Sequence, residues 1–139
     1  MMRMLEGAGR LWESAEMSPP RITVNDISWG NNISEQFGGP FPPHSSHQNG
    51  LDVDIRYVRT DDAEAPLNVA DDPESHDQFA TSHLISYLNQ RGKLVKVIVS
   101  SKVMLDNPDP FSSALVIDDD GEHDDHFHVR IADPDGTDN

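Results

Sequence analysis

The chain has 139 residues, no cysteine and a formal net charge of −15, from 25 Asp and Glu against 10 Lys and Arg. This length predicts a single domain over residues 1–139, with one hydrophobic core. The charge argues against nucleic-acid binding through a basic patch. The missing cysteines exclude disulfides, thiolate metal sites and a cysteine nucleophile.

The first part of the chain is predicted to hold one helix and two strands. Residues 3–17 have an amphipathic helical pattern that stops at Ser18-Pro19-Pro20, and they lack the apolar stretch of a signal peptide or a membrane span. Alternating apolar and polar residues predict strands over Arg21–Ile27 and Leu51–Val58. Between them, Trp29–Ser46 is rich in Gly, Pro, Asn and Ser, and loops of this length are usually functional or disordered.

The second part is predicted to hold one helix and three strands. An acidic, turn-rich stretch over 61–72 precedes a helix over Glu74–Gln90, with Gly92 placed to end it as the C′ glycine. The apolar residues that this helix offers for burial are Phe79, Leu84, Ile85, Tyr87 and Leu88. The predicted strands are Leu94–Val99, central in the sheet, then Leu115–Ile117 and Phe127–Ile131; the connecting loops are 106–113 and 118–125, and a frayed acidic tail begins at about residue 133.

Two of the predicted strands share one design, in which one face is apolar and the other carries ionisable groups. Side chains alternate between the two faces of a strand. The ionisable side chains that this alternation places together are Asp52, Asp54 and Arg56 on one strand and His126, His128 and Arg130 on the other. If the two strands pair antiparallel, they bring a carboxylate and two imidazoles together.

A third element joins these strands. His47 lies seven residues before Asp54, and the turn at Asn49-Gly50 lets its side chain reach the polar face. Imidazole and carboxylate ligands at roughly 2.0–2.2 Å suit Zn²⁺, and a site with two histidines and one carboxylate keeps a fourth position open, as catalytic zinc sites do. Water bound there has its pKa lowered toward ~7 and becomes a nucleophile.

Less specific interpretations apply to several of these residues. A strand that alternates Asp and Arg is usually just a solvated face. His76 and His83 belong to the helix region and are interpreted as surface or partly buried residues. The acidic run 118–122 lacks the spacing of an EF-hand, so it is interpreted as a solvated turn.

Two segments resemble a known family. Residues 38–55 (GGPFPPHSSHQNGLDVDI) and residues 123–130 (HDDHFHVR) are similar to the motifs of the penicillin-insensitive murein endopeptidases. These belong to a larger group of zinc peptidases with the D-Ala-D-Ala carboxypeptidases and dipeptidases, lysostaphin-type enzymes and the hedgehog signalling domain. The pattern Ser-x-His-x-x-Gly-x-x-x-Asp of the larger group fits residues Ser45, His47, Gly50 and Asp54.

The resemblance implies a fold and a site. The fold is α+β, a small antiparallel sheet with flanking helices, as in the hedgehog and D-Ala-D-Ala-peptidase domains. One zinc ion per chain is held by His47, Asp54 and His128, with room for a second metal. His126 is the catalytic histidine, acting as general base or stabilising the developing charge. His123 is a second catalytic candidate that acts on the substrate or on a second metal, and either His123 or His44 stabilises the oxyanion.

The resemblance also implies a role for a further histidine. His44 contacts the substrate or a second metal. Independently of the resemblance, the ring nitrogens of His47 and His128 that do not bind zinc are expected to be held by backbone carbonyls or carboxylates. Asp52, Asp124 and Asp125 are nearby candidates, with plain surface acids as the alternative interpretation of each.

The implied activity is hydrolysis of D-alanyl–meso-diaminopimelyl bonds in peptidoglycan cross-links, in the periplasm or outside the cell, although no leader is readable. Other substrates stay open: a D,D-carboxypeptidase or dipeptidase, a lysin-type L-alanyl-D-glutamate endopeptidase, or an enzyme acting on a related peptide polymer. Two non-enzymatic alternatives are a zinc-containing binding domain that has lost catalysis and a purely structural metal site. His126 favours an enzyme, because a binding module has no need of it.

Overall fold

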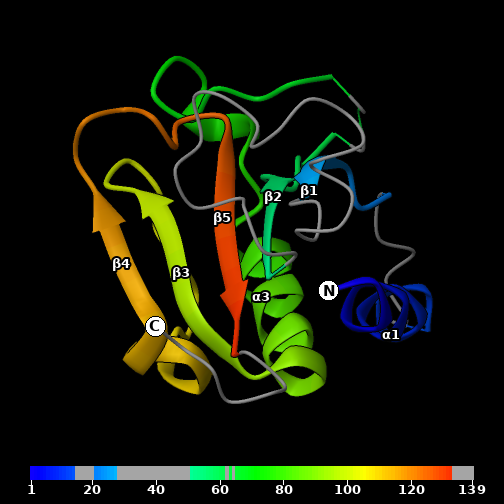
Figure 1. Cartoon of the computed structure of the whole chain (residues 1–139). Helices are drawn as coiled ribbons and strands as arrows, with labels where there is room; N and C mark the ends of the chain where they lie inside the picture. Colours follow the sequence, from blue (N-terminus) through cyan, green and yellow to red (C-terminus); the bar gives the residue numbers. More distant parts are fainter. Residues whose placement is uncertain (15–20, 28–50, 62, 64, 133–139) are drawn as a thin grey trace, which may run out of the picture.

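A computed structural model describes residues 1–14, 21–27, 51–61, 63 and 65–132 (Figure 1). The elements are α1 (Met2–Glu13), β1 (Val24–Ile27), β2 (Asp52–Arg56), the 3-10 helix η1 (Pro73–Ser75), α3 (Gln78–Gly92), β3 (Leu94–Ser100), the 3-10 helix η2 (Asp109–Ala114), β4 (Leu115–Asp118) and β5 (His126–Ile131). The predicted α+β class is confirmed. The predicted loop over 29–46, with His44, and also His47 and the tail from 133 lie outside the described residues.

The five strands form one sheet in the order β1-β2-β5-β3-β4. Three neighbouring pairs are antiparallel, but β4 runs parallel to β3, with Val97 opposite Leu115 and Ser100 opposite Asp118. The prediction of a purely antiparallel sheet is therefore wrong at this edge. The segment 101–114, with η2, is long enough to carry the chain back along the sheet, which a parallel pair requires. The centre of the sheet is β5, with β3 beside it.

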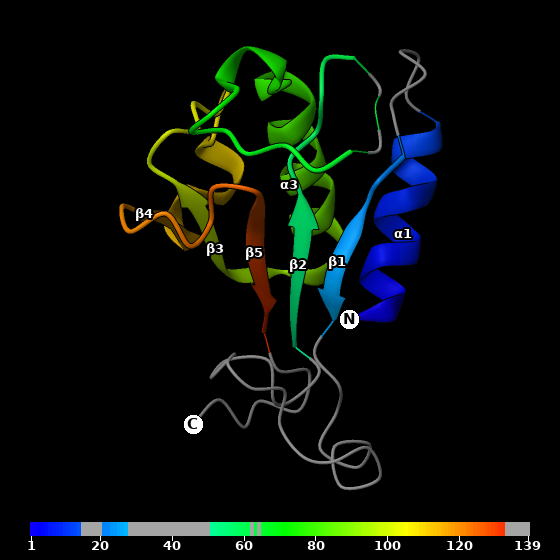
Figure 2. The same cartoon turned by 90° about the horizontal axis from the view of Figure 1, so that it is seen from above.

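The two helices lie on the same side of the molecule. Figure 2 shows α3 against one face of the sheet and α1 beside it, next to β1. The Trp12 ring of α1 meets the Tyr87 ring of α3 edge to face, with centroids 6.3 Å apart. No helix in the described part of the chain has both the length and the apolar composition needed to cross a bilayer.

Helix α3 begins and ends differently from the prediction. It starts at Gln78, where the Asp77 side chain accepts a hydrogen bond from the Ala80 N–H at 2.8 Å. Gly92 is its last residue, and Lys93 takes the left-handed conformation (φ 47°). Gly92 is needed for close packing instead, because a Cβ there would lie 2.7 Å from Met4 Cγ.

The core fills the space between the sheet and the helices. Its fully buried residues include Val53 and Ile55 of β2, Val97 and Val99 of β3, Phe127 and Val129 of β5, and Leu84, Ile85 and Leu88 of α3. The prediction of burial is wrong for Phe79, which is 46% exposed in the first turn of α3 and stacks on the ring of His83 instead.

Candidate functional site

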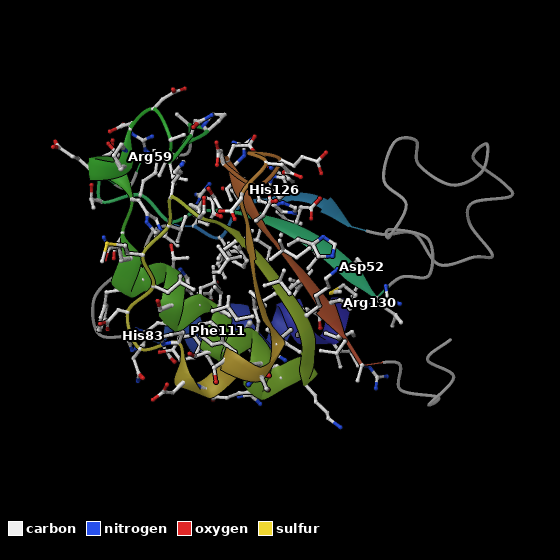
Figure 3. The ribbon with its side chains drawn as sticks, turned by 90° about the vertical axis from the view of Figure 1, so that its left-hand side faces the viewer. Asp52, Arg59, His83, Phe111, His126 and Arg130 are labelled. Atoms are coloured by element: carbon white, nitrogen blue, oxygen red, sulfur yellow. The ribbon has the colours of Figure 1, made fainter. Side chains whose placement is uncertain are left out.

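The predicted antiparallel pairing of the two polar strands is confirmed. In β2 and β5, Asp52 lies opposite Arg130, Asp54 opposite His128 and Arg56 opposite His126. The alternate pairs are apolar and face the core. Figure 3 shows Asp52, His126 and Arg130 along these two strands. A carboxylate and two imidazoles therefore meet on one face, as the alternation of the sequence predicts.

This polar face is more buried than a solvated strand face. Asp52 is 0% exposed, Asp54 3% and His128 4%. Buried carboxylates are costly unless they are paired or hydrogen-bonded. The interpretation of β2 as a plain solvated face is therefore wrong, because these side chains form a buried polar network.

His128 is the centre of this network. Its Nδ1 lies 2.8 Å from Asp54 Oδ1, and its Nε2 lies 3.0 Å from Asp52 Oδ1. Asp52 also accepts a hydrogen bond of 2.6 Å from Arg130. Burial alone would lower the pKa of His128, but the bonds to Asp52 and Asp54 outweigh it and raise that pKa to about 9.

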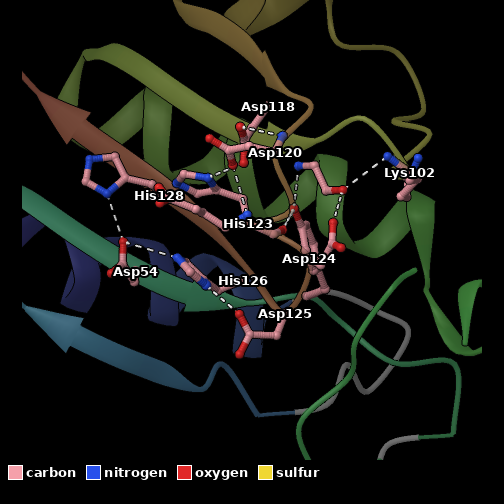
Figure 4. Close-up of polar contacts among 12 residues, drawn as sticks. Asp54, Lys102, Asp118, Asp120, His123, Asp124, Asp125, His126 and His128 are labelled. Carbon is pink, nitrogen blue, oxygen red and sulfur yellow. Dashed lines mark hydrogen bonds and ion pairs between the residues drawn. The ribbon is translucent and has the colours of Figure 1, made fainter. Parts of the chain in front are cut away.

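The other two histidines of the site each have a carboxylate on Nδ1. His126 Nδ1 lies 2.7 Å from Asp125 Oδ1, and its Nε2 lies 3.9 Å from Asp54 Oδ1 (Figure 4). His123 Nδ1 lies 2.7 Å from Asp118 Oδ2. The centroid of the His123 ring is 5.1 Å from that of His126 and 6.4 Å from that of His128. The three rings thus form one cluster, with the same Asp54 oxygen facing two of them.

The acidic residues before β5 have specific partners that no pattern in the sequence predicts. Asp118 was grouped with a solvated turn, but its side chain is only 14% exposed and contacts His123. Burial would raise the pKa of Asp118, but the hydrogen bonds from His123 and from the Asp120 N–H lower it. Of the three carboxylates expected to hold ring nitrogens, Asp52 contacts His128 and Asp125 contacts His126. The third, Asp124, contacts Ser100.

A metal ion would find two of the three predicted ligands side by side. Asp54 Oδ1 and His128 Nδ1 are oxygen and nitrogen donors of the kinds that zinc prefers. Asp52 then occupies the second nitrogen of His128, as outer carboxylates do beside zinc-bound histidines. Within the described ranges, no three His, Asp or Glu side chains are grouped to hold a metal. The predicted third ligand, His47, and the predicted substrate residue, His44, lie outside these ranges.

No protein-family model, curated protein or solved structure matches this chain.

Proposed function

We propose that this chain is a zinc-dependent endopeptidase that hydrolyses D-alanyl–meso-diaminopimelyl bonds in peptidoglycan cross-links. The single observation that supports it most is the register of β2 with β5, which places Asp54 directly opposite His128 and brings His126 Nε2 to the same carboxylate oxygen. The substrate class follows from the resemblance of residues 38–55 and 123–130 to murein endopeptidases.

In this proposal Asp54 and His128 hold the zinc ion together with His47. When bound, zinc polarises the scissile carbonyl and makes a water molecule acidic enough to attack it. Asp52 keeps the His128 ring in orientation through Nε2, and Arg130 balances the charge of Asp52. The two buried acids therefore have different proposed tasks: Asp54 would hold the metal, and Asp52 supports the imidazole of His128.

His126 is placed to move the proton. In the neutral ring, Asp125 takes the hydrogen bond from Nδ1–H, which leaves the Nε2 lone pair directed toward Asp54 and the space beside it. Nε2 can accept the proton of the attacking water and pass it to the leaving amine. His123 stands beside His126, and in its protonated form its Nε2–H can donate a hydrogen bond to the negative charge that develops on the carbonyl oxygen.

The pairing of histidines with carboxylates favours an enzyme over a zinc-containing binding domain. A binding domain needs only the metal ligands. Here His126 and His123, neither of which is a proposed ligand, are each held through Nδ1 by a carboxylate of their own. Such pairs fix the ring orientation and the position of its proton, which proton transfer requires.

Digestion of purified murein tests the proposal. Zinc-loaded protein is incubated with cross-linked murein, and the released muropeptides are identified by mass spectrometry. We expect cross-linked dimers to be converted to monomers by cleavage between D-alanine and diaminopimelate. Release of D-alanine alone, or cleavage between L-alanine and D-glutamate, would replace this specificity with one of the two other peptidase activities.

Two histidine variants show whether the site described here is responsible. His126→Ala is expected to lower the rate by about 10²-fold or more, since it removes the proton-transfer group. His83→Ala, which removes a histidine of α3 that stacks on Phe79, is the matched control and should digest murein like the wild type. The proposal fails if the zinc-loaded wild type cleaves no murein of any peptide type, or if His126→Ala is as active as the control.

A further inference from the structure

The loop over 119–125, which joins β4 to β5 and carries His123, has no apolar side chain that could anchor it in the core. Most of its residues are acidic, and like charges at short range repel. Its position beside the site therefore depends on hydrogen bonds with the rest of the molecule.

The first of these bonds comes from a buried tyrosine. Tyr57 is 3% exposed, and its hydroxyl donates to the carbonyl oxygen of His123 at 2.9 Å. The same hydroxyl accepts a hydrogen bond from the Ser100 N–H at 3.0 Å, at the end of β3. Tyr57 thus connects the backbone of His123 directly to the sheet, and its ring packs on the core residue Phe127.

The next residue of the loop is fixed as well. The Asp124 side chain accepts a hydrogen bond from the Ser100 hydroxyl, which itself accepts one from the Lys102 N–H at 3.1 Å (Figure 4). The Asp124 carbonyl accepts from the Val69 N–H at 2.8 Å. Ser100 is 1% exposed, so its hydroxyl and the Tyr57 hydroxyl are buried anchor points on the sheet.

These contacts hold the backbone while Asp118 holds the ring. The Asp118 carboxylate lies 2.7 Å from His123 Nδ1. When the imidazole is neutral, the carboxylate accepts a hydrogen bond from Nδ1–H. The Nε2 atom then carries the free lone pair, because the bond at one ring nitrogen decides the state of the other. If the His123 carbonyl moved away from Tyr57, the ring would leave Asp118 and its place beside His126.

We propose that Tyr57 is a positioning residue for His123: with Ser100 and Asp124 it fixes the loop so that Asp118 can hold the His123 ring as one tautomer, facing His126. The part of this inference that concerns catalysis rests on the function proposed above. Among the described residues, Tyr57 makes neither a hydrogen bond nor a ring contact with Asp54, His128 or the rings of His123 and His126, and it acts through the backbone of His123.

Tyr57→Phe is the variant that tests the role, because it removes one oxygen and keeps the ring. Tyr87→Phe is the matched control, since the chain has only these two tyrosines and Tyr87 lies on α3 against Trp12. Ser100→Ala is the second variant, which removes the bond to Asp124 and keeps Tyr57. Each variant is first shown to be folded by circular dichroism.

Two readouts are measured on each zinc-loaded protein. One is kcat and KM for murein peptides, where Tyr57→Phe is expected to lower kcat by about 10- to 100-fold, as small misplacements of catalytic groups do, with KM little changed. The other is the nitrogen NMR spectrum of the His123 ring, recorded at about pH 8. We expect one tautomer, with the proton on Nδ1, in the wild type and in Tyr87→Phe, and a mixture in Tyr57→Phe and Ser100→Ala.

The inference is overturned if Tyr57→Phe keeps the single His123 tautomer, whatever happens to kcat, or if the tautomers mix while kcat stays unchanged. If the wild type itself cleaves no murein, the proposed function has failed. The NMR spectra then decide alone whether Tyr57 positions His123. If Tyr57→Phe does not fold, the His123 spectrum of a folded Ser100→Ala variant decides whether these loop contacts position His123.

Discussion

His76 makes the stability of this protein depend on pH. The sequence places it in the helix region, but it lies between η1 and α3 and is only 7% exposed. Its Nε2 lies 3.0 Å from the Thr81 hydroxyl, and its ring meets Tyr57 edge to face, with centroids 5.3 Å apart. Burial lowers the pKa of His76 to about 4, although Asp77 works to raise it. The folded protein therefore holds a neutral imidazole at neutral pH.

The size of the effect follows from the two pKa values. In the unfolded chain the imidazole takes a proton below about pH 6.5, whereas in the folded chain it does so only below about pH 4. Because the unfolded state binds more protons in this window, the free energy of unfolding falls as the pH falls through it. At pH 5 the loss from this one residue is about 2 kcal/mol, and it approaches about 3 kcal/mol below pH 4.

Urea unfolding at pH 7.5 and at pH 5 measures this loss. His76→Gln keeps a polar group for Thr81 but cannot titrate, so its free energy of unfolding should fall by about 2 kcal/mol less than that of the wild type. Ile85→Val is the control for a variant that is less stable at both pH values. It lowers the free energy of unfolding by about 1 kcal/mol, adds no titratable group and should keep the pH dependence of the wild type. If His76→Gln and the wild type lose equal stability between the two pH values, the reasoning about His76 is refuted.

Two further predictions concern the supporting contacts. Asp52→Asn should weaken zinc binding by about 10- to 100-fold, because it removes the carboxylate that holds the His128 ring. Equilibrium dialysis measures this, and Asp125→Asn, which changes a contact of His126 instead, should bind zinc like the wild type. Gly92→Ala should lower the free energy of unfolding by about 1–3 kcal/mol, since its Cβ would lie 2.7 Å from Met4 Cγ. Adding Met4→Ala to the Gly92→Ala chain should recover part of this loss. If Gly92→Ala unfolds thermally at the same midpoint temperature as the wild type, the close contact is disproved.

Much of the site could be predicted from the sequence because its signal is local. Alternation with period two assigns Asp54 and His128 to polar faces and Val53 and Val129 to apolar ones, and two such strands bury their apolar faces only in a matching register. The register that the structure shows is therefore the one that the sequence favours.

The features that were missed depend on parts of the chain distant in sequence. The direction of β4 depends on the path that residues 101–114 take from the end of β3. The residues of β4 themselves carry no signal of that path. Gly92 fits the sequence pattern of a helix cap, but the side chains packed against it are those of Met4 in α1 and Ile131 in β5. The role of Tyr57 depends on Ser100 and on the His123 carbonyl, which no spacing in the sequence brings together.

The zinc content of the dialysed protein tests the central claim most directly, because the claim is that the face shared by β2 and β5 holds a catalytic metal. Elemental analysis of the wild type, His128→Ala and His126→Ala should find about one zinc ion per chain in the wild type and in His126→Ala, and almost none in His128→Ala, since of these two histidines only His128 is a proposed zinc ligand. A wild type that retains no zinc, or a His128→Ala variant that retains as much as the wild type, would contradict this account.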